Sequence, residues 1–73
     1  MKRAITTGDA RMVARILNLA ERCRCRCTFV TAEHQGDQSY YHVSIEFEGA
    51  DDALRLLDSQ LNRILAYEKE LSA

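Results

Sequence analysis

The sequence lacks proline and tryptophan, and it contains neither a long apolar run nor a hydrophobic leader. We therefore expect neither a membrane span nor a signal peptide, and the expected compartment is the cytoplasm. An excess of positive charge is also missing, because ten Lys and Arg stand against eleven Asp and Glu, for a formal net charge of -1. Domains that bind nucleic acid usually carry a clear basic excess, so we expect no nucleic-acid partner.

The chain is short, and its composition is that of a globular protein. Its 73 residues predict a single domain spanning 1–73. Hydrophobic residues make up 47% and charged residues 29%, a mixture that is typical of folded chains. A core of this size is marginal on its own, and self-association, a metal or disulfides often supply the missing stability.

Two segments have helical spacing of apolar residues. Residues 9–22 carry a stripe at i, i+3, i+4 and i+7, with a plausible N-cap at Asp9. Residues 51–64 repeat the pattern after two aspartates, which suit the positive end of a helix dipole. The expected stripes are Val13, Ile16, Leu17 and Ala20 in the first helix, and Leu54, Leu57, Leu61 and Ile64 in the second.

Between these segments the period changes to two. Residues 39–48 alternate apolar and polar, which predicts a half-buried strand, and residues 34–38 form a turn centred on Gly36. Residues 24–33 are its expected antiparallel partner. Folding the hairpin about Gly36 places opposite each other the pairs Cys25 and Phe47, Cys27 and Ile45, Phe29 and Val43, Thr31 and Tyr41, Arg26 and Glu46, and Arg24 and Glu48.

Cysteine and arginine alternate in "ERCRCRC", residues 21–27. On a strand this pattern sends Cys25 and Cys27 into the core, where cysteine acts as a small hydrophobe, and the arginines toward solvent. A metal, redox or disulfide role is the alternative, but residues two apart on a strand lie about 6.6 Å from each other. Zinc-bound sulfurs lie much closer together, and that spacing is near the upper limit for a disulfide. Cys23 falls where the first helix ends, and an exposed thiol there could be reactive.

Adding short strands at residues 2–7 and 66–71 gives the order strand, helix, strand, strand, helix, strand. This order predicts an α+β, ferredoxin-like fold with a four-stranded antiparallel sheet and both helices on one face. The residues that carry several known functions of this fold are missing here. The loop "TTGDAR" has no CxxC motif, which a metal chaperone would need. The strand "SYYHVSIEF" lacks the glycine and the basic residue of an RNA-binding strand. His34 and His42 have no nucleophile or carboxylate arranged for catalysis, so we expect no enzyme activity.

Two stretches, "RMVARILNLAERCRCRCTFVTAE" and "YYHVSIEFEGADDALRLLDSQLNRILAYE", resemble the ACT domain, a small amino-acid-sensing regulatory module. The resemblance is strongest in "ARILNLAERC" and "LLDSQLNRIL" and covers nearly the whole chain. More narrowly, the chain is similar to the short regulatory small subunit of acetolactate synthase (acetohydroxyacid synthase), of the valine-insensitive type. Its length is that of one bare ACT domain.

The resemblance implies a regulatory subunit of branched-chain amino-acid biosynthesis that binds and activates a catalytic large subunit. That partner would carry thiamine diphosphate, magnesium and FAD, whereas this chain would hold no cofactor and no catalytic residue. It also implies a homodimer through the edge of the second strand, with residues 24–31 near the two-fold axis.

The resemblance further implies an effector site between two domains, at the turn from the first strand into the first helix and against the neighbour's second strand. The matching positions are Gly8, Asp9, Ala10, Arg11 and Met12, facing Arg26 and Cys27. Arg11 stands where the family usually has glycine. Its side chain could crowd the site or instead clamp an effector carboxylate.

Three classes of function remain open from the sequence. The first is the activating subunit of acetolactate synthase, and the second is a free-standing ACT sensor that regulates another enzyme. The third is a ferredoxin-like protein that uses its cysteines for a metal.

Overall fold

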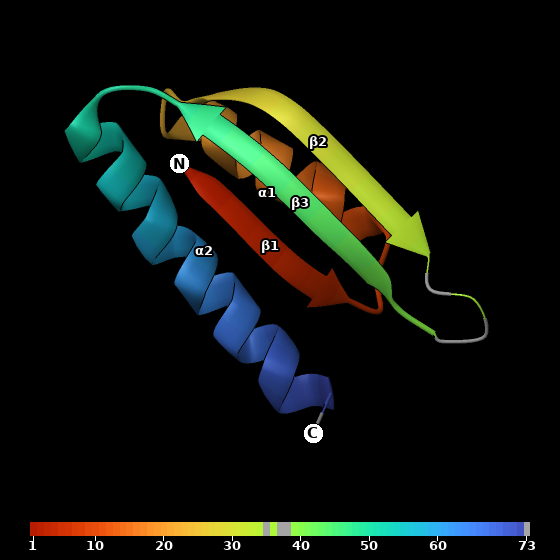
Figure 1. Ribbon diagram of the computed structural model, residues 1–73. Coiled ribbons are helices and arrows are strands. Elements are labelled where there is room, and N and C mark those ends of the chain that lie inside the picture. The colour runs from red at the N-terminus through yellow and green to blue at the C-terminus, as the bar shows by residue number, and fades with distance from the viewer. Residues whose placement is uncertain (35, 37–38, 73) are drawn as a thin grey trace.

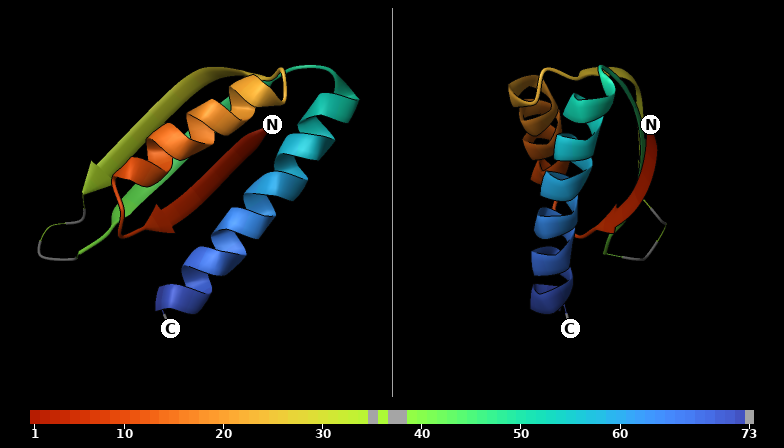
Figure 2. Two further views of the ribbon diagram at one scale, coloured as in Figure 1. Left: turned by 180° about the vertical axis from the view of Figure 1, so that it is seen from behind. Right: turned by 90° about the vertical axis from the view of Figure 1, so that its left-hand side faces the viewer.

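The computed structural model describes residues 1–34, 36 and 39–72. Three strands form one antiparallel sheet in the order β1-β3-β2: β1 is Lys2–Thr7, β2 is Arg26–His34 and β3 is Tyr41–Glu48. The helices α1 (Arg11–Arg22) and α2 (Asp51–Ser72) lie on one face of the sheet and leave the other face open (Figure 1, Figure 2). The protein is thus α+β, with an arrangement compatible with a ferredoxin-like fold.

The core lies between the sheet and the two helices. Residues 2–7 form the predicted first strand, and the alternation in β3 buries Val43, Ile45 and Phe47 as predicted. Both helices face these side chains. The buried apolar residues are Met12, Ile16, Ala20, Cys23, Cys25, Val43, Ile45, Phe47, Leu57 and Leu61. Helix α1 is therefore rotated slightly from its predicted stripe, because Met12 is buried whereas Val13 and Leu17 are only half-buried.

Helix α1 ends in a left-handed turn. Arg24 has φ of 61°, the N–H of Cys25 donates to the carbonyl of Ala20 at 2.9 Å, and the N–H of Arg24 donates to that of Glu21 at 3.0 Å. These two bonds are those of a Schellman C-cap. The Cys-Arg alternation was predicted to be a strand from residue 24 onward, and this is wrong for its first half. Cys23 caps the helix, Arg24 makes the turn, and β2 begins only at Arg26.

The predicted register between β2 and β3 is also wrong. Arg26 lies opposite Glu48 and Cys27 opposite Phe47, so the strands are shifted by two residues from the expected pairing. A bulge between Cys27 and Phe29 then shifts the pairing by one more residue, and Phe29 lies opposite Glu46 instead of Val43. The turn has Gly36 at φ of 51°, in the left-handed region that favours glycine, and its residues 35, 37 and 38 lie outside the described residues.

Helix α2 begins at the predicted residue but does not end at residue 64. It continues to Ser72, so the predicted fourth strand at 66–71 is wrong and the described sheet has three strands. The physical reason is local preference: "AYEKEL" consists mainly of strong helix formers and contains no β-branched residue, glycine or proline that would end the helix. One consequence is that β1 lies at an edge of the sheet.

Candidate functional site

The turn between β1 and α1, residues 8–10, is held by short hydrogen bonds centred on Asp9. Its backbone N–H donates to the Thr7 hydroxyl at 3.1 Å, and its carboxylate accepts the N–H of Arg11 at 2.9 Å. The Arg11 guanidinium also donates to both Asp9 carboxylate oxygens, at 3.1 and 3.4 Å. This pairing lowers the pKa of Asp9 below its usual value and raises that of Arg11.

Not all predicted effector residues of this turn are available to a ligand. Met12 has 1% of its surface exposed and packs in the core, so its side chain is not offered to a ligand at this turn. Ala10 occupies the N-cap position of α1 and is exposed, as is Gly8, whose backbone runs close to the carbonyl of Ser39. The exposed residues of the predicted set on this turn are therefore Gly8, Ala10 and Arg11. The Arg11 guanidinium is already paired with Asp9.

The other two predicted residues lie at the far end of the sheet. Arg26 makes an exposed ion pair with Glu48 at 3.5 Å, and Cys27 is half-buried with its thiol donating to the carbonyl of Phe29 at 3.5 Å. The turn follows Thr7, which lies opposite Tyr41, whereas Arg26 lies opposite Glu48. Tyr41 and Glu48 are seven positions apart on β3, which corresponds to roughly 23 Å. One chain alone does not bring the two parts of the predicted site together.

The outer edge of β2 is a row of backbone groups that point away from the sheet. Met1 and Phe47 exchange both backbone hydrogen bonds, so alternate residues of β3 point toward β1 and the rest toward β2. On β2, the backbone N–H and C=O groups of Phe29, Thr31 and Glu33 consequently point back at β3. Those of Val30 and Ala32 point outward, away from the sheet. Within the described chain no backbone partner meets these outward groups. This edge has no lysine or proline, the residues that usually block strand addition.

The bulge in β2 exposes a large aromatic side chain. Phe29 is 53% exposed on the open face of the sheet, beside a shallow cavity of about 370 Å³ that also contacts Ala4 and Ser44. Its neighbour Val30, which points to the helix side, is 40% exposed. Sequence reasoning missed this feature because no glycine marks the bulge. At the bulge, the Thr28 hydroxyl donates to the carbonyl of Glu46 at 3.4 Å.

The three cysteines are free thiols in or near the core. Cys23 and Cys25 are buried, and Cys27 is half-buried, so the prediction that Cys25 packs in the core is confirmed. Burial raises the pKa of the Cys25 thiol, and the neighbouring Cys23 raises it further. Among the described side chains, no group of three or more His, Cys, Asp or Glu could hold a metal ion.

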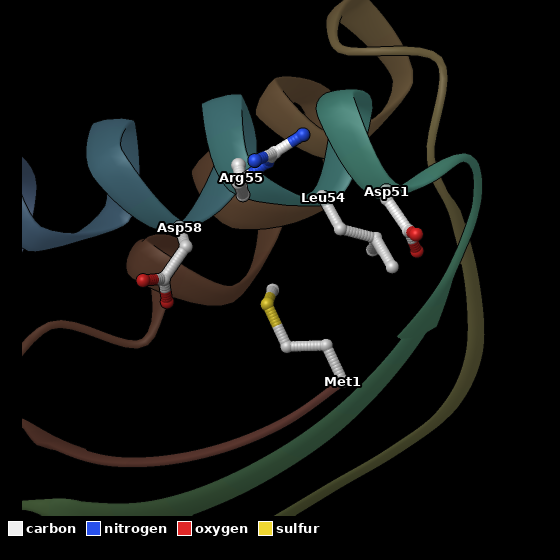
Figure 3. A pocket seen from close by; sticks show the side chains of 5 residues that line it. All are labelled: Met1, Asp51, Leu54, Arg55 and Asp58. Carbon is white, nitrogen blue, oxygen red and sulfur yellow. The ribbon is translucent and has the colours of Figure 1, made fainter.

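A second edge of the sheet, at β1, is bordered by two cavities that α2 also lines. One of about 570 Å³ lies between Met1 and Leu54, with Asp51 and Asp58 at its sides (Figure 3). The other, of about 380 Å³, is lined by β1 and the later part of α2: Arg3, Ala4, Ile5, Thr6, Asn62, Leu65 and Ala66. Sequence reasoning missed both, because it assigned residues 66–71 to a strand and not to a continuation of α2.

Comparison with protein-family models, with curated proteins and with solved structures found no match for this chain. Within the described residues, no helix combines the length and the apolar character that crossing a membrane requires.

Proposed function

We propose that this protein is a non-catalytic regulatory subunit that binds and activates the catalytic large subunit of acetolactate synthase in branched-chain amino-acid biosynthesis. The observation that carries the proposal is the resemblance of two long stretches, in the same order, to the short small subunit of that enzyme. Thiamine diphosphate, magnesium and FAD would belong to the catalytic partner.

The positions of the resembling segments in the fold support this proposal. "ARILNLAERC" forms α1 and its C-cap, and "LLDSQLNRIL" forms the middle of α2, which packs Leu57 and Leu61 against the sheet. Both segments contribute to one core. The fourth strand of an ACT domain has no counterpart among the described residues.

A homodimer through the β2 edge is part of the proposal. The outward backbone groups of Val30 and Ala32 would pair with those of a second copy running antiparallel. With the two-fold axis at Val30, the extra residue at the bulge sets Arg26 of one copy opposite Glu33 of the second copy. Both side chains lie on the open face, so two ion pairs would flank the axis.

The same pairing would assemble the effector site that one chain leaves in two parts. Glu33 and His34 lie at the end of the sheet where residues 8–10 turn into α1, because His34 is opposite Tyr41 and Tyr41 is opposite Thr7. Arg26 of the second copy would thus approach the turn of the first. This geometry also suits a free-standing ACT sensor of an amino acid, which is the second candidate function.

Mixing the chain with its cognate catalytic subunit tests the proposal. We expect no acetolactate formation by the chain alone, and a several-fold higher turnover of the catalytic subunit when the two form a complex. The measurement is acetolactate produced per catalytic subunit, with analytical ultracentrifugation of the mixture as the control for binding. A mixture that neither associates nor gains activity would favour the free-standing sensor instead.

A further inference from the structure

The edge of β1 carries unpaired backbone groups of a defined alternation. Because Met1 is hydrogen-bonded to Phe47, Arg3 and Ile5 lie in the pairs that bond to β3, and the N–H and C=O groups of Lys2, Ala4 and Thr6 point outward. No backbone partner for these outward groups occurs in residues 1–34, 36 and 39–72. Such a row is the template on which an additional strand is built.

Two cavities beside this edge could accept the side chains of an added strand. The cavities of about 570 and 380 Å³ follow one another along β1, and the Arg3 side chain crosses between them to Asp58 and Asn62 on α2. The first cavity is lined by Met1 and Leu54 together with three charged residues of α2, Asp51, Arg55 and Asp58, and Leu65 contributes to the second. Figure 3 shows the Met1 side chain reaching from the strand side toward α2, and the Leu54 side chain reaching from α2 toward the strand side. A strand added here would lay alternate side chains on apolar parts of α2.

A second copy of the whole domain does not suit this edge. Helix α2 lies beyond β1 on the helix face of the sheet (Figure 1, Figure 2). Two copies joined through their β1 strands would bring both α2 helices to the same side of the junction, where packed helices need about 8–10 Å between their axes. A single extended segment brings no helix with it. Self-pairing through both β1 and β2 would moreover build an endless ribbon in place of a closed dimer.

We propose that the β1 edge and the adjoining surface of α2 form the docking site for an extended segment of the catalytic partner, which adds to the sheet as a strand beside β1. This inference rests on the proposed function, because it names the surface that the catalytic subunit uses. The segment would alternate apolar side chains, directed at Leu54 and Leu65, with polar ones on the open face. Lys2 pairs with Glu46 at 3.2 Å, but its side chain is 81% exposed, so an acidic residue of the segment would be favoured beside it.

Hydrogen exchange tests the docking site in the wild-type protein. In the free chain, the outward amides of Lys2, Ala4 and Thr6 should exchange fast, and those of Arg3 and Ile5 slowly. In the complex with the catalytic subunit, exchange of the outward set should slow by at least about tenfold, while the inward set stays slow. If β1 were only a structural strand, the catalytic subunit would not selectively slow the exchange of its outward amides. The chain is exchanged in the complex, quenched, and read residue by residue by NMR.

A pair of proline substitutions provides the matched test. Ala4→Pro removes an outward N–H from the β1 edge, and Ala32→Pro does the same at the β2 edge, without touching the ladders to β3. We expect Ala4→Pro to remain dimeric. It should bind the catalytic subunit at least about tenfold more weakly, because the proline ring and the loss of the backbone N–H donor both oppose strand addition. Ala32→Pro should lose the dimer and keep the site for the catalytic subunit on each chain.

The outcomes separate the two proposals. If the wild type binds the catalytic subunit but the outward β1 amides remain fast, or a folded Ala4→Pro binds equally well, the docking site is wrong and the proposed function stands. If the wild type does not bind the catalytic subunit, the proposed function fails and the docking site fails with it. Should Ala4→Pro not fold, as judged by circular dichroism, the exchange pattern of the wild type decides alone.

Discussion

Arg3 on β1 is joined to Asp58 on α2 by an ion pair between residues 55 positions apart in the chain. A second nitrogen of the same guanidinium donates to the amide oxygen of Asn62 at 2.9 Å. The Arg3 side chain is only 23% exposed, so the pair is partly shielded from water. It ties the edge strand of the sheet to the long helix that lies beside it.

Removing this guanidinium should destabilise the fold measurably. Arg3→Met keeps the apolar stem and should cost about 1 kcal/mol, because a charge-assisted, half-shielded bond is lost but Asp58 can still reach water. Lys2→Met on the same strand is the matched control, since Lys2 pairs with Glu46 at 3.2 Å and its side chain is 81% exposed. Its effect should stay within a few tenths of a kcal/mol. Equal losses in urea unfolding of the two variants would contradict this.

The left-handed turn after α1 predicts a stabilising substitution. Arg24 has φ of 61°, which non-glycine residues adopt at a cost. Arg24→Gly should therefore raise the free energy of unfolding by about 0.5–1 kcal/mol, the cost of the left-handed conformation outweighing the extra freedom of glycine in the unfolded chain. Thermal unfolding followed by circular dichroism measures the change.

Arg22→Gly is the control for that experiment. It places the same residue two positions earlier, inside the last turn of α1, where glycine should lower stability by about 1 kcal/mol. If both glycine variants are destabilised, the left-handed turn is not under conformational strain.

Local sequence signals predicted most of the elements, and long-range pairing was what they missed. Period-two spacing in β3 and helical spacing in α1 each rest on many residues, so both elements were found. The strand register rests on turn geometry instead, and the bulge before Phe29 has no glycine to announce it. A shift of one residue moves a side chain to the opposite face, which is why Phe29 is exposed and not in the core.

The fourth strand and the candidate sites show a related limit. The fourth strand was assigned to residues 66–71 to complete a known arrangement of strands and helices. The local sequence favours a helix there, and α2 continues through these residues. Effector positions such as Gly8 and Arg26 were taken from a resemblance that implies two copies, so their separation in one chain was not visible in the sequence. Met12 was assigned to the site although helical spacing also allowed it in the core.

The thiols should differ strongly in reactivity. Cys27 is half-buried whereas Cys25 is only 7% exposed, and burial raises the pKa of the Cys25 thiol. Since the thiolate is the reactive form, an aromatic disulfide reagent at pH 8 should label Cys27 at least about tenfold faster than Cys25. Peptide mapping by mass spectrometry gives the order. Labelling of Cys25 before Cys27 would show that the α1–β2 connection opens readily.

The raised pKa of Cys25 also sets a direction for stability against pH. The unfolded thiol ionises near its ordinary pKa of 9.0, while the folded one stays protonated to higher pH. Its contribution is therefore complete below pH 9.0 and declines as the pH rises further. Cys25→Ala should remove this part of the decline in urea unfolding at alkaline pH.

A chelator should leave the melting temperature unchanged, because we expect the thiols to pack and not to bind metal.

Charge reversal tests the proposed dimer. Glu33→Arg would set a cation opposite Arg26 of the second copy, and we expect the dimer to weaken by at least about tenfold. Combining it with Arg26→Glu should restore part of the association, because the cross-copy pair is then re-formed with reversed charges, while the intrachain ion pair of Arg26 with Glu48 is lost. Sedimentation velocity over a concentration series gives the dissociation constants. Unchanged association of the single variant would place the two-fold axis elsewhere.

The final prediction concerns the response to branched-chain amino acids. An effector carboxylate would be held at the start of α1, where the helix dipole favours negative charge. The Arg11 guanidinium is next to this place but is engaged by both carboxylate oxygens of Asp9, and this pairing lowers the pKa of Asp9. A carboxylate would have to displace Asp9, and the arginine stem occupies space that a glycine would leave open. We therefore expect valine, leucine and isoleucine to bind weakly or not at all, and the holoenzyme to resist valine.

Two variants decide between crowding and clamping by Arg11 in titration calorimetry with valine. Arg11→Gly clears the turn, so crowding predicts tighter binding than in the wild type. Asp9→Asn frees the guanidinium while keeping the shape of the side chain, so clamping predicts that this variant gains affinity and that Arg11→Gly loses it. We expect Arg11→Gly to gain and Asp9→Asn to change little, since the freed arginine still fills the approach to the backbone. Tight valine binding by the wild type that Arg11→Gly abolishes would show that Arg11 is the carboxylate ligand of a functioning sensor.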